Sequence, residues 1–237
     1  MFRDEIKIAA ASFQIKFSDI QLNQFDIFYK TLIEWNQKIN LTTITEPKDF
    51  AIKHIIDSIS LWDEEKLSNI KTVIDIGTGA GFPGIPLKIC RPHLQIYLID
   101  SLNKRVSFLK TVVDKLQFDN VFCIHSRAED LAHKTDFREN FDLVTSRAVA
   151  RLNVLSEYCL PFVKLNGIFI ALKGSDIKEE IEESFNAIKK LGGDLPEVVN
   201  IHLPNGDTRN IIYVKKISKT SNNFPRKAGF PDKKPLN

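Results

Sequence analysis

The stretch from residue 72 to residue 86 changes from an apolar strand pattern to a glycine-rich turn and then to a helix start. Residues 73–76 suit a central parallel strand, because such strands are buried on both faces and read as nearly continuous apolar runs. In the motif Gly77-x-Gly79-x-Gly81, the glycines allow a tight turn and a close approach of the backbone to a ligand. Pro83 suits the first position of the following helix. The stretch therefore predicts a strand, a ligand-binding turn and a helix, in that order.

From this stretch onward, strand patterns alternate with helical patterns. The expected strands cover residues 72–77, 95–100, 120–125, 141–146 and 167–172. The expected helices lie near residues 83–90, 102–117, 151–160 and 176–191. This order predicts a doubly wound parallel sheet. Two further strands, at 198–203 and 210–214, are joined by Pro204-Asn205-Gly206-Asp207, which predicts a closing hairpin. We therefore expect an α/β, Rossmann-like fold with seven mostly parallel strands and an antiparallel last strand.

The region before the first strand has a different pattern. Residues 20–39 carry large apolar side chains at spacings of three and four, which predicts an amphipathic helix. A second helix is expected after Pro47, with His54, Asp57 and Ser58 clustered on one side. We therefore expect an N-terminal helical region over residues 1–65, a cofactor-binding domain over 66–217 and a basic tail over 218–237.

The composition limits the class of protein. The chain has 237 residues and 43% hydrophobic content, which suits one substantial core with an accessory region. No window is apolar enough for a membrane span, and the charged start lacks the apolar core of a signal peptide. The three cysteines are far apart, which favours core filling in a reducing cytoplasm over disulfides. The five histidines are scattered, so no metal site is expected.

Charge is distributed unevenly along the chain. From Lys215 to the end there are seven Lys and Arg residues against one Asp, a net charge of +6, which leaves about −3 for the remainder of a chain whose net charge is +3. This asymmetry suits a polyanionic partner, and a solubilising tail is the alternative. We expect the segment from Ser218 to be irregular unless it docks on the rest of the protein. The sequence indicates no protein partner, and we expect a monomer.

The glycine turn also discriminates between cofactors. It departs from the dinucleotide fingerprint, because the third glycine comes one residue early and Phe82 stands where that pattern has glycine. Asp75 lies just before the turn, where it would repel a pyrophosphate. S-adenosylmethionine has no phosphate and carries two cationic groups that an acidic pocket favours, so it is the predicted cofactor. Asp100, at the end of the second strand, is placed for a ribose contact, and a cap for the next helix is the alternative.

Further motifs carry a family resemblance. Beside the block Asp75–Leu87 they are Trp35-Asn36, Asn40-Leu41-Thr42, His54-Ile55-Ile56-Asp57-Ser58, Asp100-Ser101-x-x-Lys104-Arg105-x-x-Phe108-Leu109 and Ser146-Arg147-Ala148. With these motifs, residues 24–216 resemble the bacterial small-subunit ribosomal RNA guanine-N7 methyltransferases, also called the glucose-inhibited division protein B family. The tail from Pro225 to Leu236 resembles the ending of the longer family members.

The resemblance implies a cytoplasmic enzyme that methylates N7 of guanine 527, in the 530 loop of 16S rRNA, as free rRNA, as a 30S subunit or as an assembly intermediate. It also implies a class I methyltransferase fold over residues 66–217. By motif position, the implied cofactor contacts, besides Asp100, are Gly77, Phe82, Ala128, Glu129 and Arg147. Two alternatives stay open: Glu129 as a cap or solvated residue, and Arg147 as a contact to RNA phosphate.

Residues for the RNA side can be proposed from charge and position. The positive residues near strand ends, together with His54 as a residue that orients the base or the RNA, are the candidates Arg127, Arg147, Lys173, Arg209 and His54. A structural histidine is the alternative for His54. Phe82 or Tyr158 could stack on an unpaired base, with packing as the alternative for both.

The reaction itself makes few demands on the chain. Guanine N7 carries a free lone pair, so no base has to remove a proton, and no catalytic base is assigned. The sequence agrees, since it has neither an Asn/Asp-Pro-Pro-aromatic motif nor a Pro-Cys pair. Catalysis is expected to rest on placement and desolvation. Two other functions stay open at this point: a methyltransferase for a small molecule or protein, and an RNA-binding module with an inactive cofactor pocket.

Overall fold

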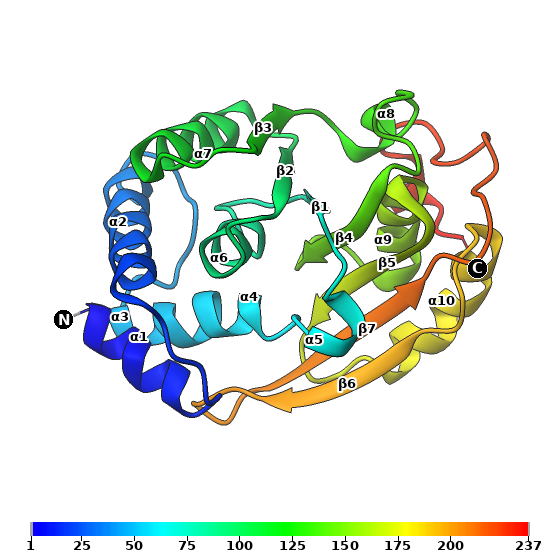
Figure 1. Cartoon of the computed structure of the whole chain (residues 1–237). Helices are drawn as coiled ribbons and strands as arrows, with labels where there is room; N and C mark the ends of the chain where they lie inside the picture. Colours follow the sequence, from blue (N-terminus) through cyan, green and yellow to red (C-terminus); the bar gives the residue numbers. More distant parts are fainter. Residues whose placement is uncertain (1, 237) are drawn as a thin grey trace.

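The computed structural model describes residues 2–236, and a seven-stranded sheet lies at its centre (Figure 1). The strands are β1 (Thr72–Ile76), β2 (Gln95–Asp100), β3 (Val121–His125), β4 (Phe141–Arg147), β5 (Val163–Lys173), β6 (Glu197–His202) and β7 (Thr208–Lys215). Their order across the sheet is β3-β2-β1-β4-β5-β7-β6. The first five strands pair in parallel, and β7 pairs antiparallel with both β5 and β6. The predicted α/β fold with an antiparallel last strand is confirmed.

The helices are distributed along the whole chain. Those before the sheet are α1 (Phe2–Ala11), α2 (Asp19–Asn36), α3 (Pro47–Phe50), the π-helical η1 (Ala51–Ile56), α4 (Asp57–Ile59) and α5 (Glu64–Leu67). Those after β1 are α6 (Gly84–Cys90), α7 (Asn103–Leu116), α8 (Ala128–Leu131), α9 (Leu152–Cys159), the short η2 (Leu160–Phe162), α10 (Lys178–Lys190) and α11 (Phe230–Lys233).

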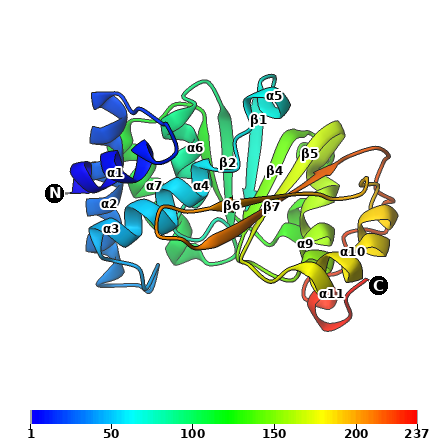
Figure 2. The same ribbon diagram turned by 90° about the horizontal axis from the view of Figure 1, so that it is seen from below.

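The helices form one layer on each face of the sheet, as the view from below shows (Figure 2). The N-terminal helices α1 to α4 lie with α6 and α7 on one face, and α9, α10 and α11 lie on the other. Each face has its own apolar core. Phe25, Phe28 and Phe50 are fully buried in the first core, while Phe162 and Phe169 are fully buried in the second. The sheet therefore separates the N-terminal helices from the C-terminal segment.

Local sequence explains where α2 begins and which face it buries. Ser18 is the N-cap residue and forms a capping box with Gln21, which satisfies backbone N–H groups at the helix start. Leu22, Phe25 and Phe28 follow at the spacing of one helix face and are buried against the first core. The expected helix over residues 20–39 is confirmed, although it ends at Asn36.

The helix expected after Pro47 is present but is not regular. Its middle part, Ala51–Ile56, is π-helical, which places an extra residue in the turn. The segment then continues as α4, so that His54 and Asp57 both face the carboxyl end of β4, where they contact Arg147. Periodicity alone predicts an ordinary α-helix here, because single π-turns leave the apolar spacing almost unchanged.

Several boundaries differ from the expectation by one or more residues, and two of these differences have a clear local cause. Helix α6 begins at Gly84, with Pro83 at the N-cap position before it, so the placement of Pro83 at the first helical position was wrong by one residue. Strand β5 starts at Val163, four residues before the expected start, and its register against β4 shifts between Phe141 and Leu143. Asn166, with φ of 66°, interrupts the apolar pattern at that point and hides the first part of the strand.

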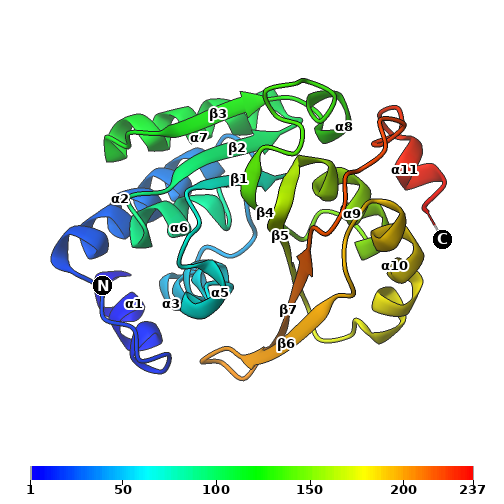
Figure 3. The ribbon, with the colours of Figure 1, turned by 45° about the vertical axis from the view of Figure 1, so that its right-hand side comes forward.

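The C-terminal segment docks on the protein. After β7 the chain runs past α10 and α9 to α8, and α11 packs against α9 (Figure 3). Phe224 and Leu236 are buried in the second core. The segment therefore docks, which was the stated exception to an irregular tail, although residues 217–229 form only turns and bends.

Candidate cofactor and base sites

The glycine turn after β1 is held from below by Asp75. Its Oδ2 accepts hydrogen bonds from Thr78 Oγ1 at 2.6 Å and from the backbone N–H of Gly84 at 3.0 Å. The side chain is fully buried, and burial raises the pKa of the Asp75 carboxyl to about 7. Asp75 therefore shapes the turn between β1 and α6 and does not line either of the cavities described below.

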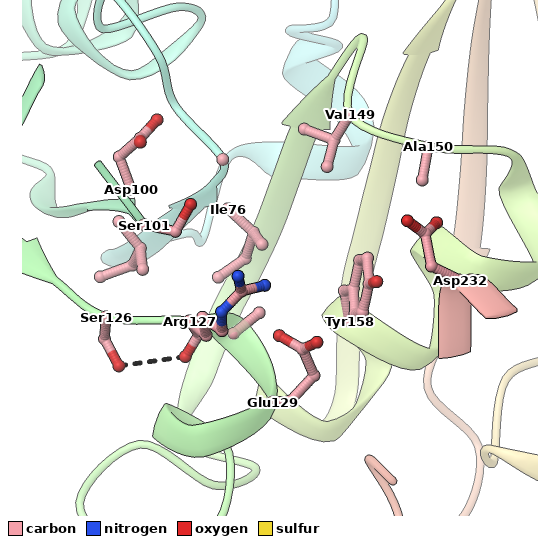
Figure 4. A pocket seen from close by; sticks show the side chains of 13 residues that line it. Ile76, Asp100, Ser101, Ser126, Arg127, Glu129, Val149, Ala150, Tyr158 and Asp232 are labelled. Atoms are coloured by element: carbon pink, nitrogen blue, oxygen red, sulfur yellow. Dashed lines mark hydrogen bonds between the residues drawn. The ribbon is translucent and has the colours of Figure 1, made fainter. Parts of the chain in front are cut away.

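An open cavity lies above the turn, at the carboxyl ends of β1, β2 and β3 (Figure 4). Its walls come from six parts of the chain and comprise Ile76, Gly77, Ile99, Asp100, Ser101, Ser126, Arg127, Ala128, Glu129, Val149, Ala150, Tyr158 and Asp232. Open parallel sheets hold their ligands at this edge. Here Gly77 is required as glycine, because φ is +68° and a Cβ would lie 2.5 Å from Val149 Cγ2.

Asp100 joins the turn to the next helix. Its Oδ2 accepts from the backbone N–H of Gly79 at 2.9 Å, and its Oδ1 accepts from that of Leu102 at 2.9 Å. The side chain is buried, with Arg105 Nη1 at 3.5 Å from Oδ2. The alternative role of Asp100 as a helix cap is therefore met in part, because its carboxylate binds the backbone N–H of Leu102, the N-cap residue of α7. The carboxylate keeps lone pairs for a hydroxyl in the cavity.

The residues after β3 form the next wall. Arg127 is the N-cap residue of α8, and its side chain lines this cavity (Figure 4). Ala128 and Glu129 open the helix. Glu129 is 5% exposed, and its Oε1 accepts from the backbone N–H of Gly229 at 2.8 Å. A segment one hundred residues away along the chain therefore fixes this carboxylate.

A second cavity adjoins the first on the other side of the segment after β4. It is lined by Ile44, Lys53, His54, Asp57, Arg147, Ala148, Leu172, Lys173, Gly174 and Arg209. Arg147 and Ala148 face this cavity, while Val149 and Ala150 line the first. The two cavities therefore share one short segment as their wall, and cations dominate the second.

Arg147 is the centre of the second cavity. Its Nη1 donates to Asp57 Oδ2 at 2.9 Å and to the carbonyl of Lys53 at 3.0 Å, and its Nη2 lies 3.2 Å from His54 Nδ1. The guanidinium also lies over the ring of Phe82, 4.8 Å from its centroid. Asp57 thus orients the arginine fork and offsets its charge.

His54 is a neutral member of this cluster. Burial first, and the Arg147 charge second, lower the pKa of His54 to about 3. Because Arg147 donates to Nδ1, the ring proton belongs on Nε2, which lies 2.8 Å from Thr42 Oγ1. Both ring nitrogens of His54 therefore have hydrogen-bond partners. Through Thr42, the Asn40-Leu41-Thr42 motif contacts the second cavity.

The other expected residues have mixed environments. Lys173 is 10% exposed and is bound by Glu180 Oε1 at 2.6 Å and by the carbonyl of Ala150. Arg209 is 23% exposed, and its Nε lies 3.3 Å from Asp57 Oδ1 in an ion pair without hydrogen-bond geometry. Of these two cations, Arg209 is the more accessible to a polyanion.

Phe82 does not line the first cavity. It is 4% exposed, and its ring stacks on that of His54 with centroids 4.4 Å apart. With His54 and Arg147 against it, Phe82 supports the second cavity from behind and has no free face for a base. Tyr158 does line the first cavity, beside Asp232.

Sequence reasoning did not find two wall-forming parts of the site. Val149 and Ala150 follow the Ser146-Arg147-Ala148 motif, and their position after a parallel strand was a usable signal. Asp232 lies in the basic tail, and no local pattern connects it to a cavity. Among residues 2–236, no cluster of His, Cys, Asp and Glu has the arrangement of a metal site.

Comparison with known proteins decides the family. A family model described as rRNA small subunit methyltransferase G matches residues 21–212. The chain belongs to this family. It is 50% identical to the ribosomal RNA small subunit methyltransferase G of Desulforamulus reducens over 98% of this chain and 97% of that protein. It is 46% identical to the protein of that name in Bacillus subtilis, over 98% of each chain.

Solved structures agree on the fold of this rRNA small subunit methyltransferase G family member. A mutant form of the 16S rRNA (adenine(1408)-N(1))-methyltransferase of Catenulisporales acidiphilia has 15% sequence identity, covers 69% of this chain and 91% of its own, and gives a TM-score of 0.53. The cofactor of the family member is S-adenosylmethionine, as the glycine turn predicted. Within the described part of the chain, no helix combines the length and apolar character of a membrane span.

The first cavity fits this cofactor chemically. It combines apolar walls from Ile76, Ile99 and Val149 with the carboxylates of Asp100 and Glu129. Apolar surface suits an adenine ring, and carboxylates suit ribose hydroxyls and cationic groups.

Proposed function

We propose that the protein transfers the methyl group of S-adenosylmethionine to N7 of guanine 527, in the 530 loop of 16S rRNA. The names of the relatives that share 46–50% of its residues support rRNA as the substrate. The structural observation that carries the proposal is the pair of adjoining cavities, one lined by carboxylates and the other by cations. The first would hold the cofactor, and the second would hold the base.

S-adenosylmethionine supplies an electrophilic methyl group on a sulfonium. The lone pair of guanine N7 forms the new N–CH₃ bond while the S–CH₃ bond breaks and its electrons return to sulfur. The guanine becomes cationic, and no proton leaves it. Since the base needs no deprotonation, the residues of the second cavity have only to position it and exclude water.

The second cavity is suited to positioning and not to proton transfer. His54 is neutral, and both of its ring nitrogens are engaged by Arg147 and Thr42. Arg147 is held as a fixed fork by Asp57 and by the carbonyl of Lys53. An arginine fork can donate to guanine O6, which stays free when N7 faces the methyl group.

Arg209 supplies the contact to the RNA backbone in this proposal. Its side chain is partly exposed at the mouth of the second cavity and pairs with Asp207 Oδ2 at 3.3 Å. Phosphate contacts position an RNA but carry no sequence information. We therefore assign orientation of the RNA to Arg209 and orientation of the base to Arg147.

Mapping the methylated nucleotide tests the proposal. Labelled S-adenosylmethionine is incubated with 16S rRNA, and separately with 30S subunits, that lack the modification, and the product is cleaved chemically at 7-methylguanine. We expect a single cleavage at guanine 527. Label at another nucleotide would refute the position, and no label in either substrate would refute rRNA methylation.

A pair of conservative variants tests the role of the arginine fork. Arg147→Lys keeps the charge but loses the planar fork, so we expect kcat to fall about 10–100-fold with little change in cofactor affinity. Arg151→Lys is the matched control, because Arg151 pairs with Glu183 at 2.7 Å on the exposed surface. Equal rates for the two variants would contradict the role of Arg147.

We also propose that the protein acts in the cytoplasm as a monomer. The rRNA substrate supports the location, and all three cysteines are free in the structure, as expected for a reducing compartment.

A further inference from the structure

The C-terminal strap, residues 220–236, is fastened to the second face of the sheet by a buried ion pair. Arg226 donates from Nε to Glu157 Oε1 at 2.9 Å and from Nη2 to Oε2 at 2.6 Å, and its backbone N–H donates to Oε1 at 2.7 Å. Glu157 lies on α9 and has no exposed surface. One of the basic residues of the tail therefore serves an internal contact.

Two side chains near α8 hold the carbonyl groups of the strap. Arg138 donates from Nη1 to the carbonyl of Phe224 at 2.8 Å and from Nη2 to that of Thr220 at 2.8 Å. His133 Nε2 lies 2.8 Å from the carbonyl of Pro225. With Phe224 and Leu236 buried in the second core, these contacts fix the path of the strap at both ends.

This path brings the strap to the cofactor cavity. The backbone N–H of Gly229 donates to Glu129 Oε1 at 2.8 Å, and α11 follows at once. Asp232 on α11 lines the cavity together with Tyr158. Figure 4 shows Asp232 across the cavity from Asp100 and Ser101, with Glu129 between the two sides.

The Asp232 carboxylate has no partner of its own. No hydrogen bond or ion pair joins it to any of residues 2–236, although Lys233 and Lys234 are its neighbours in the chain. When a ligand enters a partly apolar cavity, a carboxylate at its wall loses hydrogen bonds from water. A hydrogen-bond donor on the ligand can replace them. S-adenosylmethionine offers two such nitrogens, the adenine amino group and the amino-acid ammonium.

We propose that the strap is part of the cofactor site and that Asp232 accepts a hydrogen bond from a nitrogen of bound S-adenosylmethionine. This rests on the proposed placement of the cofactor in the first cavity. The matched region of the family model ends at residue 212, so Asp232 lies outside it. Gly229 acts beside it as a positioning residue, because its N–H fixes the orientation of Glu129.

Calorimetry without RNA tests the proposal on the full chain. Asp232→Asn keeps the shape but loses the charge, and the exposed position should leave folding unchanged. We expect affinity for S-adenosylmethionine and S-adenosylhomocysteine to fall about tenfold, the loss of one charge-assisted hydrogen bond. Lys233→Gln, one residue along the same helix, is the matched control and should bind as the wild type does.

A third ligand locates the contact. Methylthioadenosine keeps the adenine and ribose but lacks the amino acid, so an equal loss for all three ligands places Asp232 at the adenine amino group. A loss confined to the two amino-acid ligands places it at the ammonium. Unchanged binding of all three ligands would overturn the proposal. Because no RNA is present, failure here is distinct from failure of the methylation-site mapping.

Discussion

Acid should destabilise the protein through His54. Burial and the neighbouring Arg147 lower the pKa of this histidine from 6.5 to about 3. Between these values the unfolded chain binds a proton at this residue and the folded protein does not. The contribution of neutral His54 to the free energy of unfolding is therefore fully present above about pH 6.5 and is lost as the pH falls toward the folded-state pKa.

The size of this loss depends on how far the pH lies below the unfolded-state pKa of 6.5. Each pH unit below 6.5 costs about 1.36 kcal/mol, so the free energy of unfolding should fall by about 2 kcal/mol at pH 5 through this residue alone. The result is insensitive to the folded-state pKa, since any folded value below about 4 gives nearly the same loss at pH 5. A loss of this size is a sizeable part of the stability of a typical domain.

Urea unfolding at pH 7.5 and pH 5 measures the effect. The wild type should lose about 2 kcal/mol more between the two pH values than His54→Gln, whatever the stability of the variant at pH 7.5. His202→Gln is the control, because His202 is exposed on β6 and should leave the wild-type pH dependence intact. If the His54 variant loses as much stability on acidification as the wild type, the protonation argument is wrong.

Three further outcomes are expected. Gly77→Ala should cost about 1–3 kcal/mol of stability and abolish measurable cofactor binding, because the added Cβ meets Val149. Gly206→Ala is the control, because Gly206 has a similar φ but open space around it, so its substitution should only add backbone strain. Unfolding measures the stability of both variants, and calorimetry measures their cofactor binding. Arg226→Met should lower stability by about 3–5 kcal/mol by leaving Glu157 buried without its partner, and a thermal melt should show Tm lowered by about 6–20 °C. Burial raises the pKa of all three cysteine thiols, so maleimide at pH 8 should modify the native protein far more slowly than the unfolded chain.

The fold was largely readable because its signals are local. The apolar run at 73–76 and the glycine turn after it set β1, and alternation of strand and helix patterns set the doubly wound order. Errors lie where a local signal is interrupted. Asn166 conceals the start of β5, and the π-turn at Ala51–Ile56 cannot be distinguished from an α-helix by spacing.

The site was readable only in part, because ligand cavities collect residues that are distant in sequence. Strand-end and motif position predicted Gly77, Asp100 and Glu129 as cofactor contacts, and all three line the first cavity, but motif position also predicted Phe82 and Arg147, and neither lines it. Charge at strand ends predicted Arg147 and Arg209 as RNA contacts, and both line the second cavity. Charge did not predict which cations are neutralised internally. Lys173 is paired with Glu180, a partner that strand-end position does not reveal.

The acidic character of the first cavity shows the limit of prediction from sequence most clearly. Asp75 suggested a cofactor with cationic groups, and that cofactor is confirmed, yet the Asp75 carboxylate is buried beneath the turn and away from the cavity. The carboxylates at the cavity are those of Asp100, Glu129 and Asp232, the last supplied by a tail whose composition indicates the opposite charge. Net charge averages over a segment, whereas a bound ligand responds to the few atoms nearest to it. A basic tail can therefore place one acidic side chain at the wall of a cavity, and only the docked path of the tail shows which one.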